Sequence, residues 1–416
     1  MPSILFVHEY FPAQFGGLAR YLAGVGWNVV FATAREEYGL AKTDDIENFK
    51  VLRYRGGRMS INRHPYLTNT ERAVRNGQSF LRLADSLHQG GFKPDGIVTH
   101  SAWGSGLFAK SVWPDAKLVQ YLEWWVNDPA PHHTASDIQD APRDALAQNL
   151  MGNLPFLLDF QQSDLVLAPT KFQADQAPEF VQPRIVVQHD GVECDTFRPL
   201  AEDEAPFPIK GVPDDAPILT FAARSLEPIR GFYDFMAAAE QLMVQRPDLH
   251  IVVAGEDRAR YASKLKRGLG HRRTMLVRHK FDRKRLHFLG RIPKGDYMRL
   301  LRRSSVHAYL SRPFVLSWSL VEAMASACPL VVTNIPPVRE ALGATEPALM
   351  VEPGDVEQIV ASVNTLLDHP DHAQAMGAEA RERAQAAFDT TVCYPRIAQV
   401  FEDLLKRAPL GAIAAQ

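Results

Sequence analysis

Short apolar runs rich in β-forming residues alternate with helical segments from the first residues of this chain. The sequence begins with the strand-like run SILFVH, passes through a glycine-containing loop to the helical segment LARYLAGVG, and continues into a second strand-like run, NVVFAT. A strand, a helix and a strand in this order form a βαβ unit, whose two strands lie parallel because a crossover connection separates them. Helices cover both faces of such a sheet, so its strands are apolar throughout. The alternation therefore predicts a doubly wound α/β fold.

The same alternation occurs twice, on either side of a segment of different character. The first series continues through strand-like runs at 96–100, 117–121, 164–170 and 184–191. The segment FRPLAEDEAPFPIKGVPDDA then interrupts it with several prolines and an acidic run, as an interdomain linker does. A second series follows, from PILTFAA through HIVVAG and VHAYL to PLVVTN. The chain is thus predicted to form two Rossmann-like units facing a ligand cleft, because open parallel sheets bind ligands beyond the carboxyl ends of their strands.

These patterns divide the chain into four predicted segments. A length of 416 residues agrees with two sizeable cores, since one domain for every ~150 residues is usual. The last segment contains CYPRIAQVFEDLLKRA, whose apolar residues at helical spacing could pack against either domain. The predicted segments are a first domain at 1–200, a linker at 201–215, a second domain at 216–388 and a C-terminal helix at 389–416.

Composition excludes several classes of protein. With 46% hydrophobic residues, 23% charged residues and a formal net charge of -2, the chain is neither disordered nor a binder of polyanions over its whole surface. Its three cysteines, Cys194, Cys328 and Cys393, form no C-x-x-C pair and predict neither a disulfide framework nor a zinc cage, which fits a reducing cytoplasm. Without a basic leader or an apolar run of ~18 residues, the chain is expected to be soluble, or at most bound to a membrane surface.

The segment SRPFVLSWSLVEAMASACPLVVTN (311–334) contains a helix start with two interpretations. Ser319 and Glu322 match the S-x-x-E capping box, in which serine and glutamate satisfy each other's backbone amides. Alternatively, the free amides of a helix N-terminus bind a diphosphate, and the carboxylate of Glu322 accepts hydrogen bonds from both hydroxyls of a ribose. The spacing alone favours neither interpretation.

Three other loops follow strand-like runs and offer polar or flexible groups. Gly16 and Gly17 precede the first helix, where glycine allows a phosphate to approach the backbone, although a tight turn explains them equally well. Arg224 and Arg230 flank the loop RSLEPIRG and could clamp a diphosphate, or could be exposed surface arginines. His100 ends GIVTH and could donate to a substrate hydroxyl, or serve the structure alone.

Two stretches are strongly basic. Residues 50–82 contain Glu71 as their one acidic residue, and residues 258–285 read RARYASKLKRGLGHRRTMLVRHKFDRKR. Such density could bind anionic lipid, a polyanionic acceptor or nucleic acid, or could belong to solvated loops. We find neither an RNA-binding signature nor zinc-finger spacing, so nucleic acid is not an expected partner. The basic residues of the first stretch are Lys50, Arg53, Arg55, Arg58, Arg63, Arg72, Arg75 and Arg82.

Taken in order, these segments resemble the family 4 (group 1) retaining glycosyltransferases of GT-B fold. The resemblance rests on the GG loop, a histidine in the first half, HDGVECDTFRP, the Arg...Arg-Gly loop, GED, LHFLGRIPKGDY and SLVEAMASACPLVVTN, and covers nearly the whole chain. It implies two Rossmann-like domains, the first binding the acceptor and the second a nucleotide diphosphate sugar. The C-terminal helix could cross back to the first domain.

The resemblance also assigns roles to the donor-binding loops. Arg224 and Arg230 match the family's Arg and Lys that hold the donor diphosphate, although the second is arginine and the spacing is one residue longer. Glu322 matches the second glutamate of E-x7-E, which binds the nucleotide ribose. Phe314 replaces the first glutamate, which contacts the donor sugar. The backbone amides of Val315, Leu316 and Ser317 could still hold the sugar or phosphate.

In the first half, His100 matches the second histidine of a D-x-x-H-x-H pattern. Asp95 is present and Val98 replaces the first histidine, so His100 is a candidate for contact with the transferred sugar. Gly16 and Gly17 join the expected donor-binding residues. Trp124 and Trp125 in YLEWWVNDP could stack on an acceptor sugar, or could be core residues.

The resemblance implies transfer of a sugar with retention at the anomeric carbon. His100, Arg224 and Arg230 are the expected catalytic residues: the arginines stabilise the leaving diphosphate, and a phosphate oxygen deprotonates the acceptor. The chain contains no D-x-D triplet, so metal independence is expected. No cofactor is expected beyond the nucleotide sugar itself, with UDP or GDP as its nucleotide.

The expected function is therefore a retaining glycosyltransferase acting on a glycan, lipid-linked or other acceptor in bacterial surface polysaccharide or glycoconjugate synthesis. It would work in the cytoplasm, at the inner face of the membrane, where the basic stretches could contact anionic lipid. Phe314 keeps a second hypothesis open, a nucleotide-sugar-binding protein with little or no transferase activity. A sugar-nucleotide epimerase and a nucleic-acid-binding protein rank lower.

Overall fold

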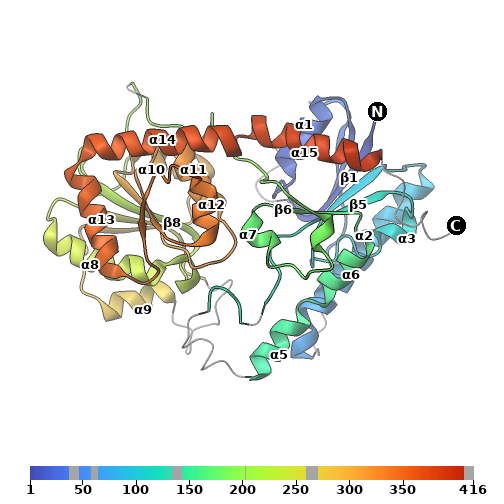
Figure 1. The fold of residues 1–416 in the computed structure, drawn as a ribbon, viewed down its shortest axis with the longest axis horizontal. Coiled ribbons are helices and arrows are strands. Elements are labelled where there is room, and N and C mark those ends of the chain that lie inside the picture. The colour runs from blue at the N-terminus through green and yellow to red at the C-terminus, as the bar shows by residue number, and fades with distance from the viewer. Residues whose placement is uncertain are drawn as a thin grey trace. The chain divides into compact units, whose positions relative to one another are not determined.

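The computed structural model describes residues 1–36, 46–57, 64–127, 129–133, 143–201, 203–258 and 270–406. These residues form two compact units (Figure 1). The first unit contains residues 1–190 and 393–416, and the second contains residues 191–392. The division lies before the boundary predicted at residue 200, because residues 191–200 pack with the second unit. Arg58, Arg63 and residues 259–269 of the basic stretches lie outside the described residues.

The first unit is built on a parallel sheet of seven strands in the order β3-β2-β1-β4-β5-β6-β7. The strand order reverses between β1 and β4, which makes this point the topological switch of the sheet. The strands are β1 (Ser3–Phe11), β2 (Asn28–Glu36), β3 (Phe49–Arg53), β4 (Gly96–His100), β5 (Lys117–Tyr121), β6 (Leu165–Ala168) and β7 (Ile185–Val187).

Helices cover both faces of this sheet, and the run SILFVH shows why. Successive side chains of a strand point to opposite faces, so Ile4 and Phe6 enter one apolar cluster and Leu5 and Val7 enter another. The helices are α1 (Gly16–Gly24), α2 (Thr68–Gln89), α3 (Ala109–Val112), α5 (Arg143–Met151), α6 (Leu154–Gln162), α7 (Lys171–Ala174), and the 3-10 turns η1 (Pro65–Leu67) and η2 (Gln182–Arg184).

The second unit contains a parallel sheet of six strands in the order β10-β9-β8-β11-β12-β13. Its switch point lies between β8 and β11. The strands are β8 (Ile218–Ser225), β9 (His250–Glu256), β10 (Leu286–Gly290), β11 (Val306–Tyr309), β12 (Leu330–Thr333) and β13 (Leu349–Val351).

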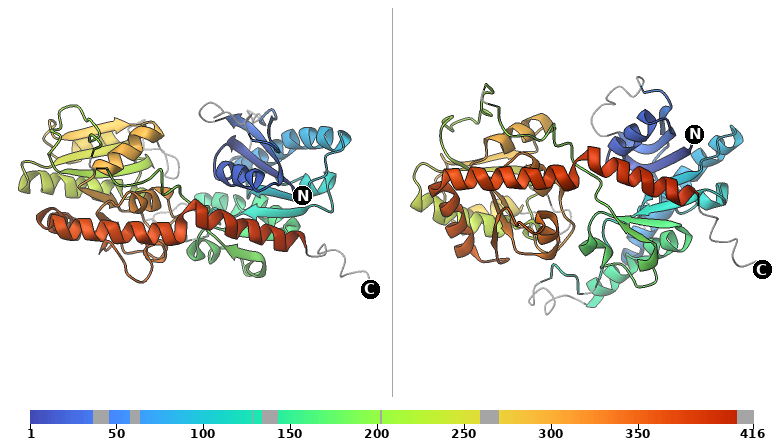
Figure 2. Two further views of the ribbon diagram at one scale, coloured as in Figure 1. Left: turned by 90° about the horizontal axis from the view of Figure 1, so that it is seen from above. Right: turned by 45° about the horizontal axis from the view of Figure 1, so that its top comes forward.

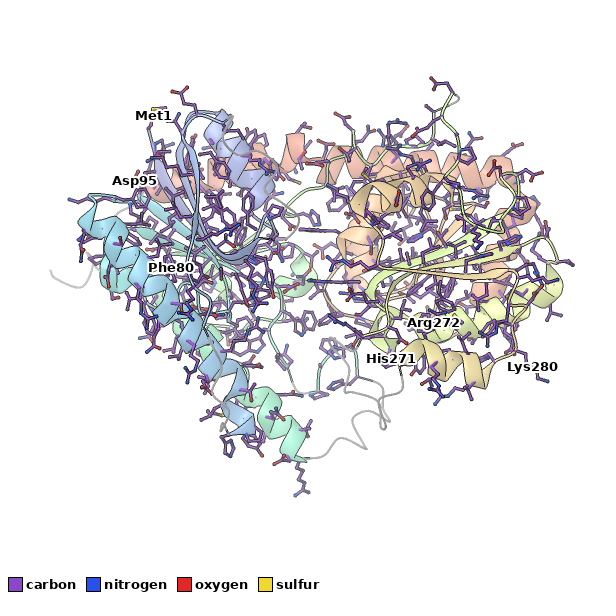
Figure 3. All side chains as sticks on the ribbon, turned by 180° about the vertical axis from the view of Figure 1, so that it is seen from behind. Met1, Phe80, Asp95, His271, Arg272 and Lys280 are labelled. Atoms are coloured by element: carbon purple, nitrogen blue, oxygen red, sulfur yellow. The ribbon has the colours of Figure 1, made fainter. Side chains whose placement is uncertain are left out.

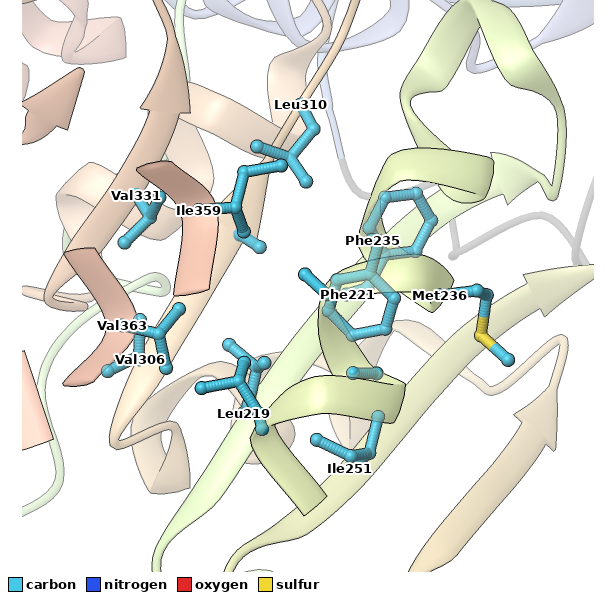
Figure 4. Close-up of a cluster of buried hydrophobic side chains, with 14 of the residues drawn as sticks. Leu219, Phe221, Phe235, Met236, Ile251, Val306, Leu310, Val331, Ile359 and Val363 are labelled. Atoms are coloured by element: carbon cyan, nitrogen blue, oxygen red, sulfur yellow. The ribbon is translucent and has the colours of Figure 1, made fainter. Parts of the chain in front are cut away.

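The helices of the second unit bury an apolar cluster on each face of its sheet. On one face, Leu219 and Phe221 of β8 pack with Phe235 and Ile359, as Figure 4 shows. On the other, Leu320 packs with residues that follow β12. The helices are η3 (Pro228–Arg230), α8 (Phe232–Gln245), α9 (His271–Arg278), α10 (Lys294–Arg303), α11 (Trp318–Ala325), α12 (Pro336–Leu342), α13 (Val356–Asp368) and α14 (Pro370–Phe388).

The C-terminal helix α15 (Thr390–Leu405) completes the core of the first unit. Its residues Ile397, Phe401 and Leu404 are buried with Ile4 and Phe6 of β1. Figure 2 shows this segment in red, continuing from α14. The segment predicted as a helix at 389–416 contains α15, but its residues 389–392 belong to the second unit. No helix among the described residues is long and apolar enough to span a bilayer.

Candidate active site

The turn after β8 in the second unit brings Arg230 beside the loop that follows β11. Arg224, exposed near the carboxyl end of β8, precedes the 3-10 turn η3, which ends at Arg230. Gly231 follows with φ at 77°, and a Cβ atom there would lie 2.0 Å from the carbonyl oxygen of Leu310. Only glycine permits this approach, because a side chain would collide with backbone and strain the left-handed conformation. Gly231 therefore places Arg230 against the 310–317 loop, at the switch point of the sheet.

The guanidinium of Arg230 is held by two neighbouring residues of that loop. Its Nη1 donates to the carbonyl oxygen of Val315 at 3.0 Å, and its Cζ lies 5.3 Å from the centre of the Phe314 ring. Phe314 is buried, with 6% of its surface exposed. A guanidinium over an aromatic face is attracted by the negative charge of the ring. Phe314, which stands where a carboxylate was expected, thus packs against the cation that we predict to bind phosphate.

The capping-box interpretation of Ser319 and Glu322 is wrong. Helix α11 begins at Trp318, and Ser317 is its N-cap, whose hydroxyl accepts from the Ser319 amide at 3.3 Å. Glu322 therefore lies inside the helix, beyond the position from which it could return to the cap. The Ser317 amide donates to the hydroxyl of Tyr309 at 3.0 Å, so it is already engaged within the protein.

The Glu322 carboxyl is partly removed from water. Its burial favours the protonated form, and its polar neighbours favour the ionised form. Burial raises its pKa to about 7, while the hydroxyl of Tyr297 and the ammonium of Lys294 act to lower it. The pKa of Tyr297 is also raised well above its usual value. Burial is the larger cause, and the nearby charge of Glu322 is the second. Tyr297 and Lys294 lie on α10, in the segment LHFLGRIPKGDY, and no motif in that segment predicted their influence on Glu322. With the capping role excluded, the contact of Glu322 with a ribose stays a prediction.

In the first unit, His100 lies at the switch point between β1 and β4. Its Nδ1 is 3.0 Å from the carbonyl oxygen of Ser101, and its Nε2 is 3.4 Å from Oε2 of Glu123. A carbonyl oxygen only accepts, so Nδ1 is the donor in the contact with Ser101. The ring centroid of Trp103 lies 4.7 Å from that of His100. This arrangement fixes the orientation of the imidazole.

His8 of β1 completes this cluster, and the sequence analysis did not single it out. Its ring centroid lies 5.6 Å from that of His100, and its Nδ1 lies 2.8 Å from the carbonyl oxygen of Tyr10. Burial, followed by the proximity of His100, lowers the pKa of His8 to about 3. His8 is therefore neutral. The signal that could have found it is its place in SILFVH, which matches that of His100 in GIVTH.

Gly16 and Gly17 are explained by packing. A Cβ atom at Gly16 would lie 2.3 Å from Cβ of Pro12, and one at Gly17 would lie 2.1 Å from the hydroxyl of Tyr394 on α15. Close packing thus surrounds both glycines, and their contact with a phosphate stays a prediction.

The two adjacent tryptophans lie in different surroundings. The ring of Trp125 is stacked 6.0 Å from Phe160 and packs against the apolar cluster of that residue. Trp124 is half-buried, with its ring 6.0 Å from Phe172 and 6.3 Å from His132. The core interpretation therefore explains Trp125, and the contact of Trp124 with an acceptor stays a prediction.

Asp159 fixes the turn that follows His100. Its Oδ2 accepts from the amide of Ala102 at 2.8 Å, where Ala102 has φ at 65°, and its Oδ1 is buried without a hydrogen-bond partner among the described residues. Burial raises the pKa of Asp159 to about 7. The carboxyl thus keeps its proton in the folded protein at a pH where the unfolded chain has lost it.

We expect the Asp159→Asn variant to be more stable than the wild type at pH 8, by about 1 to 3 kcal/mol. A raised pKa stabilises the fold below pH 4, and this contribution is lost as the pH rises through 7. Asparagine still accepts from Ala102 and never ionises. Urea unfolding at pH 5 and pH 8 measures the difference, which should be larger at pH 8, with the exposed Asp85→Asn as control. An equal difference at both pH values would contradict this account.

The described residues contain no group of three or more His, Cys, Asp and Glu side chains arranged to hold a metal ion. The candidate site residues lie near the switch point of each sheet and offer guanidinium, carboxyl, imidazole and backbone groups.

Two family models match consecutive parts of the chain. A model described as glycosyl transferase family 4 group matches residues 25–197, and one described as glycosyl transferases group 1 matches residues 203–383. Together they cover both series of strands and helices, and they meet near the predicted linker.

Curated relatives match part of the chain. A glycogen synthase of Mycobacterium tuberculosis (strain ATCC 25618 / H37Rv) is 27% identical over 183 residues, which cover 42% of this chain and 40% of the relative. A D-inositol 3-phosphate glycosyltransferase of Thermobispora bispora is 26% identical over 245 residues, which cover 55% of this chain and 54% of the relative. The match thus spans about half of the length of each relative.

Solved structures match over nearly the whole length. Sucrose-phosphate synthase from Thermosynechococcus elongatus has a TM-score of 0.71 at 18% identity, covering 97% of this chain and 99% of its own. Anabaena Alr3699/HepE in complex with UDP and glucose has a TM-score of 0.70 at 15% identity, covering 97% and 100%. These likenesses confirm the predicted GT-B fold of two doubly wound units. The chain belongs to the group 1 glycosyltransferases.

Proposed function

We propose that this protein transfers a sugar from a nucleotide diphosphate sugar to a glycan or lipid-linked acceptor. The observation that carries the proposal is the arrangement of Arg230 beside the start of α11, the helix that bears Glu322, at the switch point of the second unit. Family membership supports it. Complexes of Anabaena Alr3699/HepE with UDP and with UDP-glucose also support it, because that protein shares the fold.

In this proposal, each group of the second unit binds a different part of the donor. The guanidinium groups of Arg224 and Arg230 bind the diphosphate, because a planar fork of N–H donors matches phosphate oxygens. The carboxylate of Glu322 accepts hydrogen bonds from the ribose hydroxyls. The first turn of α11 contributes its partial positive charge to the diphosphate.

Catalysis would be mainly electrostatic. As the bond between the sugar and the diphosphate breaks, negative charge grows on the diphosphate, and Arg224 and Arg230 stabilise that charge more in the transition state than in the ground state. A phosphate oxygen would deprotonate the acceptor hydroxyl, and the sugar would be transferred with retention. This scheme needs no protein nucleophile and no metal ion. UDP or GDP is the nucleotide we expect.

His100 would contact the transferred sugar. Replacing His100 with alanine should lower kcat by about tenfold to a hundredfold, the effect of one lost hydrogen bond to a polar group held in the transition state. Nucleotide affinity should stay unchanged, since the nucleotide is bound by the second unit. Steady-state kinetics with nucleotide titration separate the two quantities. A variant that loses nucleotide affinity along with kcat would contradict this role.

Lipid-linked acceptors would place the protein at the inner face of the cytoplasmic membrane, in the synthesis of surface polysaccharide or glycoconjugate. A second candidate is a nucleotide-sugar-binding protein without transferase activity. Phe314 favours it, because an aromatic ring cannot accept hydrogen bonds from a sugar as a carboxylate does.

A thermal-shift screen against UDP, GDP, ADP and their common sugar conjugates tests nucleotide binding. A ligand that binds only the folded state raises the melting temperature according to its affinity and concentration. We expect one nucleotide family to stabilise the wild type, and both Arg230→Ala and Glu322→Ala to lose most of the shift. If no nucleotide raises the melting temperature, both candidate functions fail.

A further inference from the structure

Helix α9 and the segment after it form a basic surface on the second unit, which we call the α9 surface. Residues 270–285 contain Asp282 as their one acidic residue. Figure 3 labels Arg272 near the start of α9 and Lys280 beyond its end. The exposed cationic residues of the α9 surface are Arg272, Arg273, Arg278, Lys280, Arg283 and Lys284.

The backbone of the α9 surface is fixed on helix α8. The hydroxyl of Tyr233 lies 2.9 Å from Nδ1 of His271, at the start of α9. At its end, the carboxylate of Glu240 accepts from the Lys280 amide at 2.6 Å and contacts Nδ1 of His279 at 2.6 Å. Because both ends of α9 are held, its side chains are presented in a defined arrangement.

Three of the arginines serve the structure of the unit itself. The Cζ atom of Arg272 lies 4.1 Å from the ring centre of Phe288, and that of Arg278 lies 5.6 Å from the ring centre of Tyr233. Arg285 donates to three backbone carbonyl oxygens and to Asp282. These contacts within the unit explain the three arginines without a second molecule that binds them.

The other four cations have no such explanation. In the part of the chain that the structure describes, the side chains of Arg273, Lys280, Arg283 and Lys284 form no ion pair with a carboxylate. All four are exposed. The carboxylates of Glu240 and Asp282 interact electrostatically with Lys280 and Lys284, but the cations outnumber these carboxylates, and the excess of like charge costs free energy in the isolated protein. A negatively charged partner would remove that cost.

Two exposed valines accompany these cations. Val277 on α9 exposes 79% of its surface, and Val244, one turn beyond Glu240 on α8, exposes 80%. Apolar side chains among basic ones suit the boundary between headgroups and acyl chains of a bilayer.

We propose that the α9 surface docks on a bilayer containing anionic lipid. Clusters of about four to eight lysines and arginines bind acidic headgroups, and the exposed cations of the α9 surface form a cluster of this size. The whole chain has a net charge of -2, so the attraction must come from a local surface. Single-stranded nucleic acid is a poorer match, because bases need open aromatic faces and the rings of Phe288 and Tyr233 are covered by Arg272 and Arg278.

Docking here would not depend on transferase activity, so it can be tested without substrate. Vesicles of phosphatidylglycerol and phosphatidylcholine, and vesicles of phosphatidylcholine alone, are sedimented with the full-length protein at low and at high salt. We expect binding only to the anionic vesicles, and weaker binding at high salt because salt screens the attraction. The variant Arg273→Glu, Lys280→Glu, Arg283→Glu, Lys284→Glu should bind at least tenfold more weakly and unfold at the same temperature.

The control carries the same charge change on exposed cations of the first unit, namely Lys50→Glu, Arg55→Glu, Arg82→Glu and Lys93→Glu. It should keep vesicle binding. Loss of binding in this control, with binding kept in the α9 variant, would overturn the proposal and move the contact to the first unit. The proposal also fails if the wild type ignores anionic vesicles, or if it binds single-stranded RNA and not vesicles.

Discussion

The Arg230→Ala variant should lose about a hundredfold to a thousandfold in kcat for sugar transfer, the cost of removing one donor aimed at developing negative charge. The guanidinium is held by Phe314 and by the carbonyl oxygen of Val315, so it is positioned before the donor arrives. It therefore needs little rearrangement when charge grows on the diphosphate. The fold should survive, because the lost contacts contribute only about 1 kcal/mol each. Steady-state kinetics and thermal unfolding measure the two effects.

Two further variants make this result specific. Arg230→Lys keeps the positive charge but loses the planar fork and its stacking on Phe314, so its kcat should fall between those of alanine and the wild type. Lys210→Ala removes an exposed cation of the same unit outside the α9 surface and should leave kcat unchanged. An Arg230→Ala enzyme with the kcat of the wild type would show that this arginine does not stabilise the leaving diphosphate.

The Glu322→Gln variant should bind its nucleotide about tenfold to a hundredfold more weakly, because hydrogen bonds to a charged acceptor are lost. Its unliganded form should be more stable than the wild type above pH 7, by about 1 to 2 kcal/mol. The pKa of Glu322 is raised to about 7 by burial, so the stability present at low pH is lost as the pH rises through that value. A carboxylate that lowers the stability of the unliganded protein and raises its affinity for the ligand is typical of a binding residue.

Calorimetric titration with the nucleotide and urea unfolding at pH 6 and pH 8 test both parts. In the wild type, affinity should rise between these two pH values as the carboxyl ionises, and Glu322→Gln should abolish this dependence. The exposed Glu379→Gln serves as control and should match the wild type in both measurements. Unchanged affinity in Glu322→Gln would remove this residue from the ribose site.

The fold was predictable because its signal is local. Alternating strand-like and helical runs identify parallel sheets covered on both faces, and the residues of SILFVH do enter two different cores. Carboxyl ends of strands then predict where ligands bind. This reasoning led to Arg224, Arg230, His100 and the loop before Glu322 without any contact being known.

What the sequence did not reveal depends on contacts between distant residues. The start of α11 at Trp318 depends on Ser317 as cap, two residues before the serine that the pattern favoured. The stacking of Arg230 on Phe314 depends on Gly231 approaching Leu310, and no local pattern reports this.

The same limit applies to pairs of side chains. His8 meets His100 only because β1 and β4 are neighbours in the sheet. Tyr297 affects the pKa of Glu322 from another helix. Residues 191–200 were assigned to the first domain because the predicted linker was placed at 201–215, whereas their packing joins them to the second unit.

The most direct test of the central claim is turnover. The wild type and Arg230→Ala are incubated with the nucleotide sugar that the screen identifies and with a panel of glycan and lipid-linked acceptors, and nucleoside diphosphate and glycoside are followed by proton NMR. The account predicts diphosphate release matched by a new glycoside of retained anomeric configuration, at least a hundredfold faster in the wild type than in the variant. Tight nucleotide-sugar binding with no diphosphate release under any condition would contradict it and identify the protein as a binder.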